Sequence, residues 1–290
     1  MQKSGPRVVL KEGPTNYRMW YEAVGANGIT TIAYATSTDG LAWTKRGVVM
    51  TPNGQSSWEK DENSPGFIVL ENGVYKLWYH AGGFFVGGTG TRFGGARIGY
   101  ATSADGLTWT KHANNPVLDV AAAGTFDDEQ VAEPRVIKIG NSYRMYYTGA
   151  NANSKLKSLG MATSADGIAW AKDNRNPILD TNRWGNFWGG AFFFENGIWQ
   201  LWHGVEGGSG QIHYKWSLDG ITWTNGIQSP VLDAANTVNG PDTALVGDSI
   251  SGYRDGANYR IFYTGFAQNL FGNLGRFEGI NMASIATTCP

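Results

Sequence analysis

The sequence has 290 residues, a formal net charge of −1 and only 16% charged residues. No run of lysine and arginine is present, which excludes the basic patch of a nucleic-acid-binding or membrane-binding protein. No apolar stretch approaches the roughly 18 residues that a membrane span needs, and the single cysteine, Cys289, excludes an intrachain disulfide and a cysteine-based metal site.

The chain begins with a series of short strand patterns. In order they are the apolar run Val8-Val9-Leu10, the aromatic strand Tyr17-Arg18-Met19-Trp20-Tyr21, a strand ending in Tyr34-Ala35-Thr36-Ser37, and a strand that contains Trp43. Asp39-Gly40 separates the last two strands. Asp-Gly after a strand indicates a tight hairpin, because glycine adopts positive φ and the Asp side chain accepts hydrogen bonds from backbone N–H groups. This order predicts a four-stranded antiparallel unit.

The same order of patterns recurs along the rest of the chain. The later apolar runs are Phe67-Ile68-Val69-Leu70, Val136-Ile137-Lys138-Ile139, Phe192-Phe193-Phe194 and Ala244-Leu245-Val246. The aromatic strands that follow them are Tyr75-Lys76-Leu77-Trp78-Tyr79, Tyr143-Arg144-Met145-Tyr146-Tyr147, Trp199-Gln200-Leu201-Trp202-His203 and Tyr259-Arg260-Ile261-Phe262-Tyr263. Further Asp-Gly turns begin at Asp105, Asp166 and Asp219, whereas the last strand, Gly279-Ile280-Asn281-Met282-Ala283-Ser284, has no such turn after it.

These repeats predict an all-β fold, a five-bladed β-propeller with four-stranded antiparallel blades and an incomplete last blade, formed by residues 1–290 as a single domain. The apolar runs are typical of strands buried on both faces, so we place them innermost. A β-sandwich and a solenoid are the alternatives, which the repeat pattern favours less. Parallel βαβ units are excluded because no helical periodicity separates the strands.

The two faces of such a propeller are expected to differ. The Asp-Gly turns lie on one face, and we interpret their aspartates as turn-capping residues. The opposite face carries the starts of the inner strands and the ends of the aromatic strands, where the repeats diverge. The residues before the inner strands are Gly5, Ser64, Glu133, Gly189 and Gly240, and those at the ends of the aromatic strands are Glu22, His80, Thr148, His203 and Thr264. Unlike groups from different blades indicate one asymmetric central site rather than a repeated lectin-like site.

The aromatic strands, the strand Ile98-Gly99-Tyr100-Ala101-Thr102-Ser103 and the Asp-Gly-x-x-Trp turns resemble those of the five-bladed propeller glycoside hydrolases. This superfamily of arabinanases, β-xylosidases, invertases and mannoside phosphorylases is similar over nearly the whole chain. The resemblance implies catalytic carboxylates near the starts of inner strands, often followed by proline, and Glu133-Pro134-Arg135 matches that arrangement. Asp61 and Asp242 occupy comparable places, whereas the first inner strand begins Ser4-Gly5-Pro6-Arg7 without the expected acid.

Glycoside cleavage needs a protonated carboxyl that donates to the leaving oxygen and a second carboxylate that activates water or attacks the anomeric carbon. We therefore predict that Glu133 is the general acid, that Asp61 is the base, and that Asp242 is a third carboxylate that orients the substrate or tunes the pKa of its neighbour. The alternative for each residue is a solvated loop acid without a catalytic role.

Contacts with the substrate are expected from Glu22, Trp58, His80, Arg135, Trp188 and His203. The histidines either bind sugar hydroxyls, hold a metal as neutral imidazoles or pack at strand ends. The tryptophans either stack on sugar rings or belong to the core. Together with Phe126, they would keep Glu133 protonated near neutral pH, because burial raises a carboxyl pKa.

The expected partner is a carbohydrate or another small molecule, with no nucleic acid and no membrane. No cofactor is expected, and a central divalent ion is the alternative. The sequence defines neither the oligomeric state nor the compartment, although removal of a signal peptide would indicate an extracellular or periplasmic protein. A non-catalytic carbohydrate-binding propeller and an enzyme of other chemistry on the same scaffold are alternatives to a glycosidase.

Overall fold

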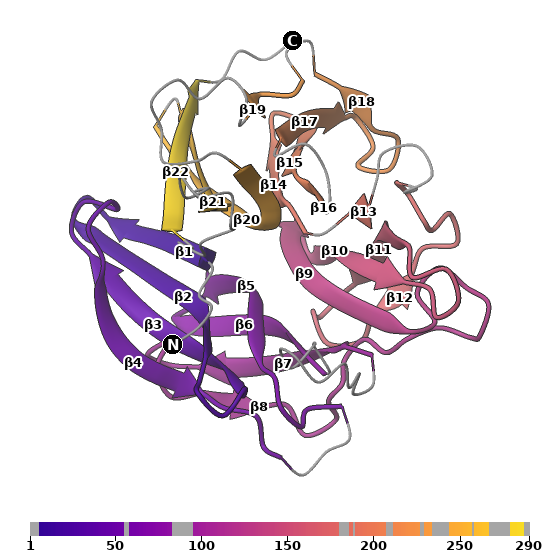
Figure 1. The fold of residues 1–290 in the computed structure, drawn as a ribbon, viewed down its shortest axis with the longest axis horizontal. Coiled ribbons are helices and arrows are strands. Elements are labelled where there is room, and N and C mark those ends of the chain that lie inside the picture. Colours follow the sequence, from indigo (N-terminus) through magenta and orange to yellow (C-terminus); the bar gives the residue numbers. More distant parts are fainter. Residues whose placement is uncertain are drawn as a thin grey trace, which may run out of the picture.

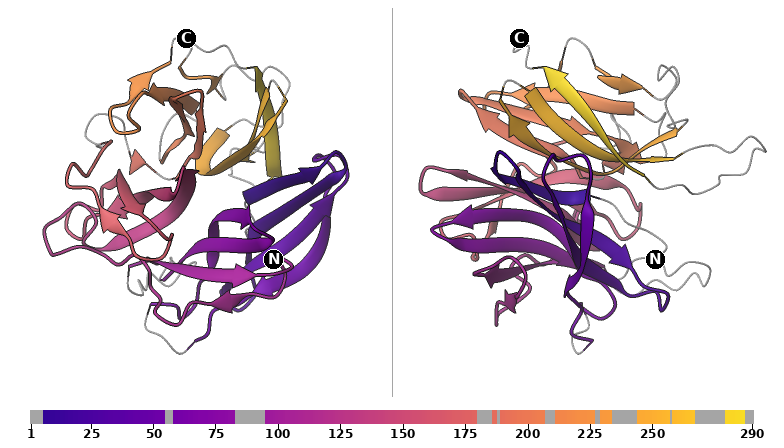
Figure 2. Two further views of the ribbon diagram at one scale, coloured as in Figure 1. Left: turned by 180° about the vertical axis from the view of Figure 1, so that it is seen from behind. Right: turned by 90° about the vertical axis from the view of Figure 1, so that its left-hand side faces the viewer.

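The computed structural model describes residues 6–54, 58–82, 95–179, 186–187, 189–206, 211–226, 229–233, 244–256, 258–266 and 279–286. Within these ranges the regular secondary structure consists of β-strands. Antiparallel sheets stand around a central axis, with the first strand of each sheet innermost (Figures 1 and 2). The chain is thus an all-β propeller with four-stranded antiparallel blades. The described residues contain no helix suited to crossing a membrane.

Three sheets have the complete blade pattern, in which strands pair in chain order. The first contains β1 (Pro6–Gly13), β2 (Asn16–Val24), β3 (Thr30–Ser37) and β4 (Thr44–Met50). The second contains β5 (Ser64–Glu71), β6 (Val74–Ala81), β7 (Arg97–Ser103) and β8 (Thr110–Lys111). The third contains β9 (Gln130–Ile139), β10 (Ser142–Ala150), β11 (Lys157–Ser164) and β12 (Ala171–Lys172).

The other described strands form a fourth sheet, a three-stranded last sheet and a two-stranded ribbon. The fourth sheet contains β14 (Ala191–Glu195), β15 (Ile198–His203), β17 (Gln211–Ser217) and β18 (Thr224–Asn225), with β19 (Leu232–Asp233) also paired to β17. The last sheet contains β20 (Ala244–Asp255), β21 (Asn258–Phe266) and β22 (Gly279–Ala286). The ribbon pairs β13 (Asn186–Phe187) with β16 (Val205–Glu206).

The Asp-Gly hairpins are built by local hydrogen bonds. In the first hairpin, Oδ1 of Asp39 accepts hydrogen bonds from the backbone N–H groups of Leu41 and Ala42, both at 2.8 Å, and Gly40 has a φ of 74°. Ser37 donates its hydroxyl to the same carboxylate at 2.8 Å. The backbone donors lower the pKa of Asp39, as expected for a carboxylate that caps N–H groups. The prediction that these aspartates are turn residues is confirmed.

Three of the hairpins also anchor the aromatic strand of the preceding sheet. Trp20 donates its indole N–H to the carbonyl of Gly106 in the second sheet at 2.8 Å, and Trp78 donates to Gly167 in the third sheet at 2.8 Å. The hydroxyl of Tyr146 donates to the carbonyl of Gly220 in the fourth sheet at 2.9 Å. The repeated Trp or Tyr therefore ties neighbouring sheets together at the hairpin face.

The hydrophobic core lies between neighbouring sheets. The described residues form five clusters of this kind, each containing residues of two adjacent sheets. One of them places Val9 and Met19 of the first sheet against Phe262 of the last sheet. The chain therefore closes on itself through side-chain packing.

The inner strand of the last sheet differs from the prediction. Ser251 pairs with Phe262, as Val8 pairs with Trp20 in the first sheet, so residues 250–255 occupy the inner position. The predicted run Ala244-Leu245-Val246 pairs instead with the far end of β21, beyond a register shift between Val246 and Ser251. The prediction was wrong because this irregularity separates the apolar run from the true inner segment, and Gly240 is consequently not the counterpart of Glu133.

Candidate functional site

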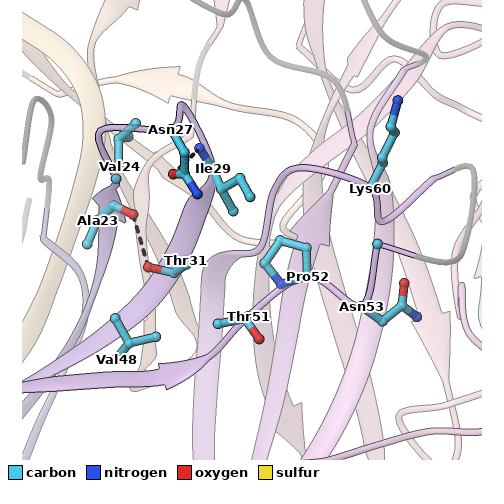
Figure 3. A pocket seen from close by; sticks show the side chains of 12 residues that line it. Ala23, Val24, Asn27, Ile29, Thr31, Val48, Thr51, Pro52, Asn53 and Lys60 are labelled. Atoms are coloured by element: carbon cyan, nitrogen blue, oxygen red, sulfur yellow. Dashed lines mark hydrogen bonds between the residues drawn. The ribbon is translucent and has the colours of Figure 1, made fainter.

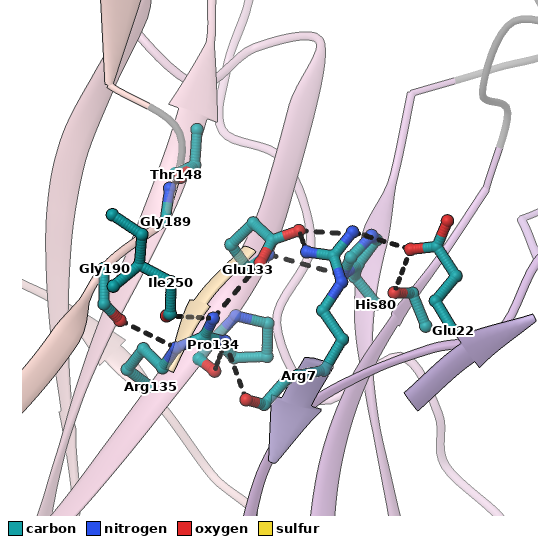
Figure 4. A network of polar contacts seen from close by, with 12 residues as sticks. Arg7, Glu22, His80, Glu133, Pro134, Arg135, Thr148, Gly189, Gly190 and Ile250 are labelled. Atoms are coloured by element: carbon teal, nitrogen blue, oxygen red, sulfur yellow. Dashed lines mark hydrogen bonds and ion pairs between the residues drawn. The ribbon is translucent and has the colours of Figure 1, made fainter. Parts of the chain in front are cut away.

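A cluster of charged side chains lies at the propeller axis, where several strands bring them together. It contains Arg7 from β1, Glu22 from β2, His80 from β6, and Glu133 and Arg135 from β9 (Figure 4). All five residues are buried, and none is more than 7% exposed. Charged groups are rarely buried unless they are paired, so their contacts define what this cluster can do.

A β-bulge on β9 sets the direction of Glu133. Arg135 pairs with Tyr146 and Ala132 pairs with Thr148, so Glu133 and Pro134 face a single residue of β10. Glu133 has a φ of 53°, which is uncommon for a residue with a side chain. Bulges re-aim side chains in this way next to functional sites. The Glu-Pro pair predicted from the sequence is therefore the local feature that turns the carboxylate toward the axis.

Arg7 bridges two carboxylates. Its Nη1 donates to Oε1 of Glu133, and its Nη2 donates to Oε2 of Glu22 at 2.6 Å. Oε2 of Glu22 also accepts the hydroxyl of Ser64 at 2.9 Å. Burial lowers the pKa of Arg7, but the two carboxylates outweigh this effect and raise it, so the guanidinium stays charged. In the sequence this strand start stands out only by its missing acid, and Arg7 was not predicted as a site residue.

Arg135 is held mainly by backbone carbonyl groups. Its Nη1 donates to Gly66 at 2.7 Å, its Nε to Gly190 at 2.8 Å and its Nη2 to Ile250 at 3.2 Å. Gly66 and Ile250 belong to two other sheets and Gly190 directly precedes β14 of a third, and Nη2 also lies 3.4 Å from Oε2 of Glu133. Burial lowers the pKa of Arg135 to about 10, so it still carries its charge at neutral pH. Arg135, which was predicted to contact the substrate, thus directs its hydrogen-bond donors to other protein groups.

The expected protonation of Glu133 is wrong. Burial by itself raises the pKa of this carboxyl, but the charges of Arg7, His80 and Arg135 outweigh burial and bring the pKa down to about 2. Glu133 is therefore an ionised carboxylate at neutral pH. The prediction considered only the apolar surroundings and omitted the cations, whose positions depend on strands far away in the sequence.

A second carboxyl, Glu62, has the opposite behaviour. It is only 3% exposed, and burial raises its pKa, with His80 offsetting part of the effect. Its Oε1 lies 3.6 Å from Nε2 of His80, whose Nδ1 accepts the backbone N–H of Glu133 at 3.4 Å. Nε2 therefore faces the two carboxyls. Nε2 is 3.9 Å from Oε1 of Glu133.

Backbone pairing selects Glu62 rather than its neighbour. Thr30 donates its N–H to the carbonyl of Asp61 at 2.9 Å and accepts the N–H of Asn63 at 3.0 Å. This short parallel bridge buries Glu62 and Asn63 and leaves Asp61 partly exposed. Oε2 of Glu62 and both polar side-chain atoms of Asn63 are buried without a hydrogen-bond partner among the described residues. Such groups are expected to bind a polar ligand or water. The sequence contained three acids in this crossover but no signal for the one that points inward.

The predicted aromatic wall is part of the blade packing. Trp58 stacks on Tyr79 with ring centroids 6.2 Å apart, and Phe126 lies against Tyr147 at 6.1 Å. Trp58 also packs against the first core cluster. These positions favour the core interpretation of both residues over contact with a sugar.

The structure does not place His203 in register with His80. Trp202 pairs with Ala191 as Trp78 pairs with Phe67, so Gly204 is the counterpart of His80. Adjacent residues of a strand point to opposite faces. The buried ring of His203 instead contacts Phe187 at 5.6 Å, and burial lowers its pKa to about 3. The predicted equivalence of the two histidines is therefore wrong by one residue.

Two predicted site residues, Asp242 and Trp188, lie outside the described residues. Within the described part of the chain, no group of three His, Cys, Asp or Glu side chains is suited to hold a metal ion. A cavity of about 210 Å³ lies beside Arg7 and Arg135, with Val8, Phe67 and Phe192 of three inner strands among its lining residues.

Comparison with family models gives a match over more than half of the chain. The model of glycoside hydrolase family 130, described as β-1,4-mannooligosaccharide phosphorylase, matches residues 89–250. An uncharacterised protein of Mycobacterium tuberculosis is 23% identical over 270 residues, which cover 84% of this chain and 86% of that protein. The 1,2-β-oligomannan phosphorylase of Thermoanaerobacter sp. (strain X514) is 27% identical over 139 residues, 46% of this chain and 43% of the relative.

Solved structures share the fold at low identity. Zg3597, a family 117 glycoside hydrolase produced by the marine bacterium Zobellia galactanivorans, has a TM-score of 0.69 and 16% identity, covering 98% of this chain and 83% of its own. A second structure has a TM-score of 0.63 and 14% identity. It is described by the statement that the family 130 mannoside phosphorylases contain glycoside hydrolases that target β-1,2 mannosidic linkages in Candida mannan. It covers 100% of this chain and 86% of its own. At these identities the likeness concerns the fold.

Proposed function

The chain belongs to glycoside hydrolase family 130, and from this premise we propose that it is an enzyme that cleaves a glycosidic bond at the axial cluster. The observation that carries the proposal is the divergence of two buried carboxyls beside His80. The pKa of Glu62 is raised, mainly by burial, whereas the cations around Glu133 outweigh its burial and lower its pKa. Titratable pairs whose environments push their pKa values apart are typical of acid–base sites.

The proposed roles follow from these protonation states. Glu62 donates a proton to the leaving glycosidic oxygen, because it is the carboxyl that stays protonated to higher pH. Glu133 remains ionised, and its charge stabilises the positive charge that develops at the anomeric carbon. His80 is proposed to position both residues, because its Nε2 lies beside the carboxyl of Glu62 and its Nδ1 accepts the backbone N–H of Glu133. Glu22 holds Arg7, which in turn fixes the orientation of Glu133.

The other predicted site residues are assigned to the margins of this site. Asp61 is proposed to bind water or a substrate hydroxyl beside Glu62, and Asp242 to orient the substrate. Trp58 and His203 are proposed to affect substrate binding only through the strands they pack against, and Arg135 through the wall of the site. Trp188 is proposed to contact the substrate.

The proposed substrate is a β-mannoside, and hence a carbohydrate. The description of the matching family model and the name of the partly aligned relative from Thermoanaerobacter support this choice. Two transfers fit the same proton donor. In phosphorolysis inorganic phosphate attacks the anomeric carbon and the product is mannose 1-phosphate, whereas in hydrolysis water attacks and the product is mannose.

The proposed architecture is one domain of five blades spanning residues 1–290, with β20, β21 and β22 as an incomplete last blade. The five core clusters between adjacent sheets support this count. The indole nitrogen of Trp202 also supports it, because it is buried without a partner in the described structure, at the place where a hairpin of the next blade would accept it.

The function is tested with β-1,2- and β-1,4-linked mannooligosaccharides, each with and without inorganic phosphate. Product analysis assigns phosphorolysis or hydrolysis. Glu62→Gln and Glu133→Gln should each reduce kcat by about 10²-fold or more, the usual effect of losing a positioned acid or a charge that stabilises the transition state. Glu12→Gln, at the opposite end of β1, is the control and should keep activity. Full activity of both axial variants would refute the assignment, and binding without turnover by the wild type would identify a non-catalytic glycan-binding protein.

A further inference from the structure

We infer that the groove beside β2 and β4 is a second sugar-binding site, which holds a neutral glycosyl unit distant from the bond that is cleaved. The groove is a cavity of about 380 Å³ on the first sheet (Figure 3). Small-molecule sites have volumes of roughly 300–1,000 Å³, so a sugar unit fits this space. The inference rests on the proposed function, since it extends the substrate from the axial site.

The two walls of the groove come from separate segments. One wall is the connection between β2 and β3, with Asn27 and Ile29, and the other is formed by residues 51–54 after β4, with Pro52, and by Lys60 (Figure 3). The first wall is fixed by its own hydrogen bonds, because Gly25 donates to the carbonyl of Ile29 at 2.9 Å and Ile29 donates to Oδ1 of Asn27 at 3.2 Å. A ligand therefore meets a preformed surface on this side.

Both walls are continuous with the elements that hold the axial carboxyls. Ala23, in the groove, directly follows Glu22 on β2. Lys60, in the opposite wall, lies two residues before Glu62. The backbone bridge between Thr30 and Glu62 joins the two segments. This continuity is the reason for assigning the groove to a distant part of the same glycan rather than to an unrelated ligand.

The chemistry of the lining residues fits a neutral sugar. Sugar rings present an apolar face and a rim of hydroxyl groups. The groove offers apolar side chains together with amide and hydroxyl groups, which are represented by Ile29, Val48, Pro52, Asn53 and Thr51. Lys60 is the only charged residue among the described lining residues, and no carboxylate is among them. The described part of the lining therefore contains no pair of cations that would favour a phosphorylated ligand.

The test fills the groove without altering the axial cluster. Val48 lines the groove and is 52% exposed on β4, so Val48→Trp should fold and occupy the space. The matched control is Val74→Trp, at an exposed position at the start of β6 that does not line the groove. Binding of mannobiose and mannotetraose to the full chain is measured by isothermal titration calorimetry, and turnover of both sugars is measured in parallel.

We expect the wild type and Val74→Trp to bind mannotetraose more tightly than mannobiose. Val48→Trp should lose about tenfold in affinity and in kcat/KM for mannotetraose, the scale of one lost pocket contact, while its values for mannobiose stay unchanged. Equal affinity of Val48→Trp and the wild type for mannotetraose would overturn the groove assignment, and so would the absence of binding to the wild type.

The same experiment separates the two proposals. Length-dependent binding that is lost in Val48→Trp, without turnover of any mannoside, supports the groove and refutes the proposed reaction. Turnover of mannobiose and mannotetraose that is unaffected by Val48→Trp supports the reaction and refutes the groove.

Discussion

Arg7 donates a hydrogen bond to Glu133, although 126 residues separate them in the sequence. Arg7 lies on β1 and Glu133 on β9, which belong to the first and third sheets. The contact therefore crosses the propeller axis and does not join adjacent blades. One buried ion pair thus links the first and third sheets and also fixes the carboxylate of the candidate site.

Removal of Arg7 should be strongly destabilising. Arg7→Met leaves Glu133 buried without its closest cation, and breaking a buried ion pair typically costs about 3–5 kcal/mol. Urea denaturation followed by tryptophan fluorescence measures the free energy of unfolding. The control is Arg46→Met, because Arg46 is exposed and its side chain donates a hydrogen bond only to the hydroxyl of Thr36, at 3.0 Å, among the described residues. A similarly small change in both variants would contradict the proposed importance of the pair.

The stability of the wild type should depend on pH through Glu133. Its folded-state pKa is lowered from the ordinary 4.5 to about 2, so its contribution is fully present above pH 4.5. As pH falls from 4.5 toward 2 the unfolded chain takes up a proton first, and this contribution is lost. Glu133→Gln should show a shallower decline of stability over this range. An identical pH dependence in the two proteins would show that Glu133 is not held as a carboxylate.

Catalysis should depend on pH through Glu62. The proposed donor must be protonated, and its raised pKa extends the protonated form above the ordinary range. We therefore expect kcat to fall as pH rises through the pKa of Glu62. Glu62→Gln should lack this limb in its residual activity. The measurement is kcat for a mannooligosaccharide at saturating concentration, and an unchanged limb in the variant would assign the titration to another group.

Gly66 should be intolerant of a side chain. A Cβ atom at this position would lie 2.3 Å from Cγ of Pro134, next to the bulge that directs Glu133. Gly66→Ala is thus expected to lower the free energy of unfolding by about 1–3 kcal/mol, as for other overpacked cores, and to reduce activity. Gly13→Ala is the control, since its Cβ would meet only an ordinary contact at 3.7 Å. Equal chemical denaturation midpoints for both variants would refute the close approach of the two inner strands.

A matched pair of tryptophans tests the hydrogen bond between blades. Trp78 donates to Gly167, whereas the buried nitrogen of Trp202 has no partner among the described residues. Both Trp→Phe changes lose packing, but Trp78→Phe also loses a hydrogen bond seen in the described structure, worth about 0.5–1.5 kcal/mol. We expect Trp78→Phe to be the more destabilised of the two in urea. The reverse order would indicate that Trp202 has the stronger anchor.

Local sequence signals predicted the parts of the fold that local chemistry builds. The Asp39-Gly40 hairpin is such a part, since Ser37, Asp39 and Gly40 supply its bonds within a few residues. Glu133 was found because it is the one acid among the residues aligned before the inner strands and because the resemblance implies an acid followed by proline there. The inner strand of the last sheet was missed because a register shift interrupts the pattern between Val246 and Ser251.

The site was less predictable because it is assembled across sheets. At the start of the first inner strand the sequence showed only that the expected acid is missing. Arg7 reaches Glu133 only because the propeller closes into a ring. Glu62 depends on the backbone bridge with Thr30, which decides the acid that faces inward. The pKa of Glu133 changes direction once these neighbours are present, so burial inferred from sequence gave the wrong sign.

The hydrogen bonds of Arg135 limit how this protein can change during evolution. One planar guanidinium reaches carbonyls in or directly before strands of three other sheets, while the residue two positions earlier is the proposed reaction-site carboxylate. Lysine, with a single nitrogen, cannot reproduce that fork. New specificity is consequently easier to acquire in the outer loops and the groove than along β9, where a substitution alters structure and chemistry together.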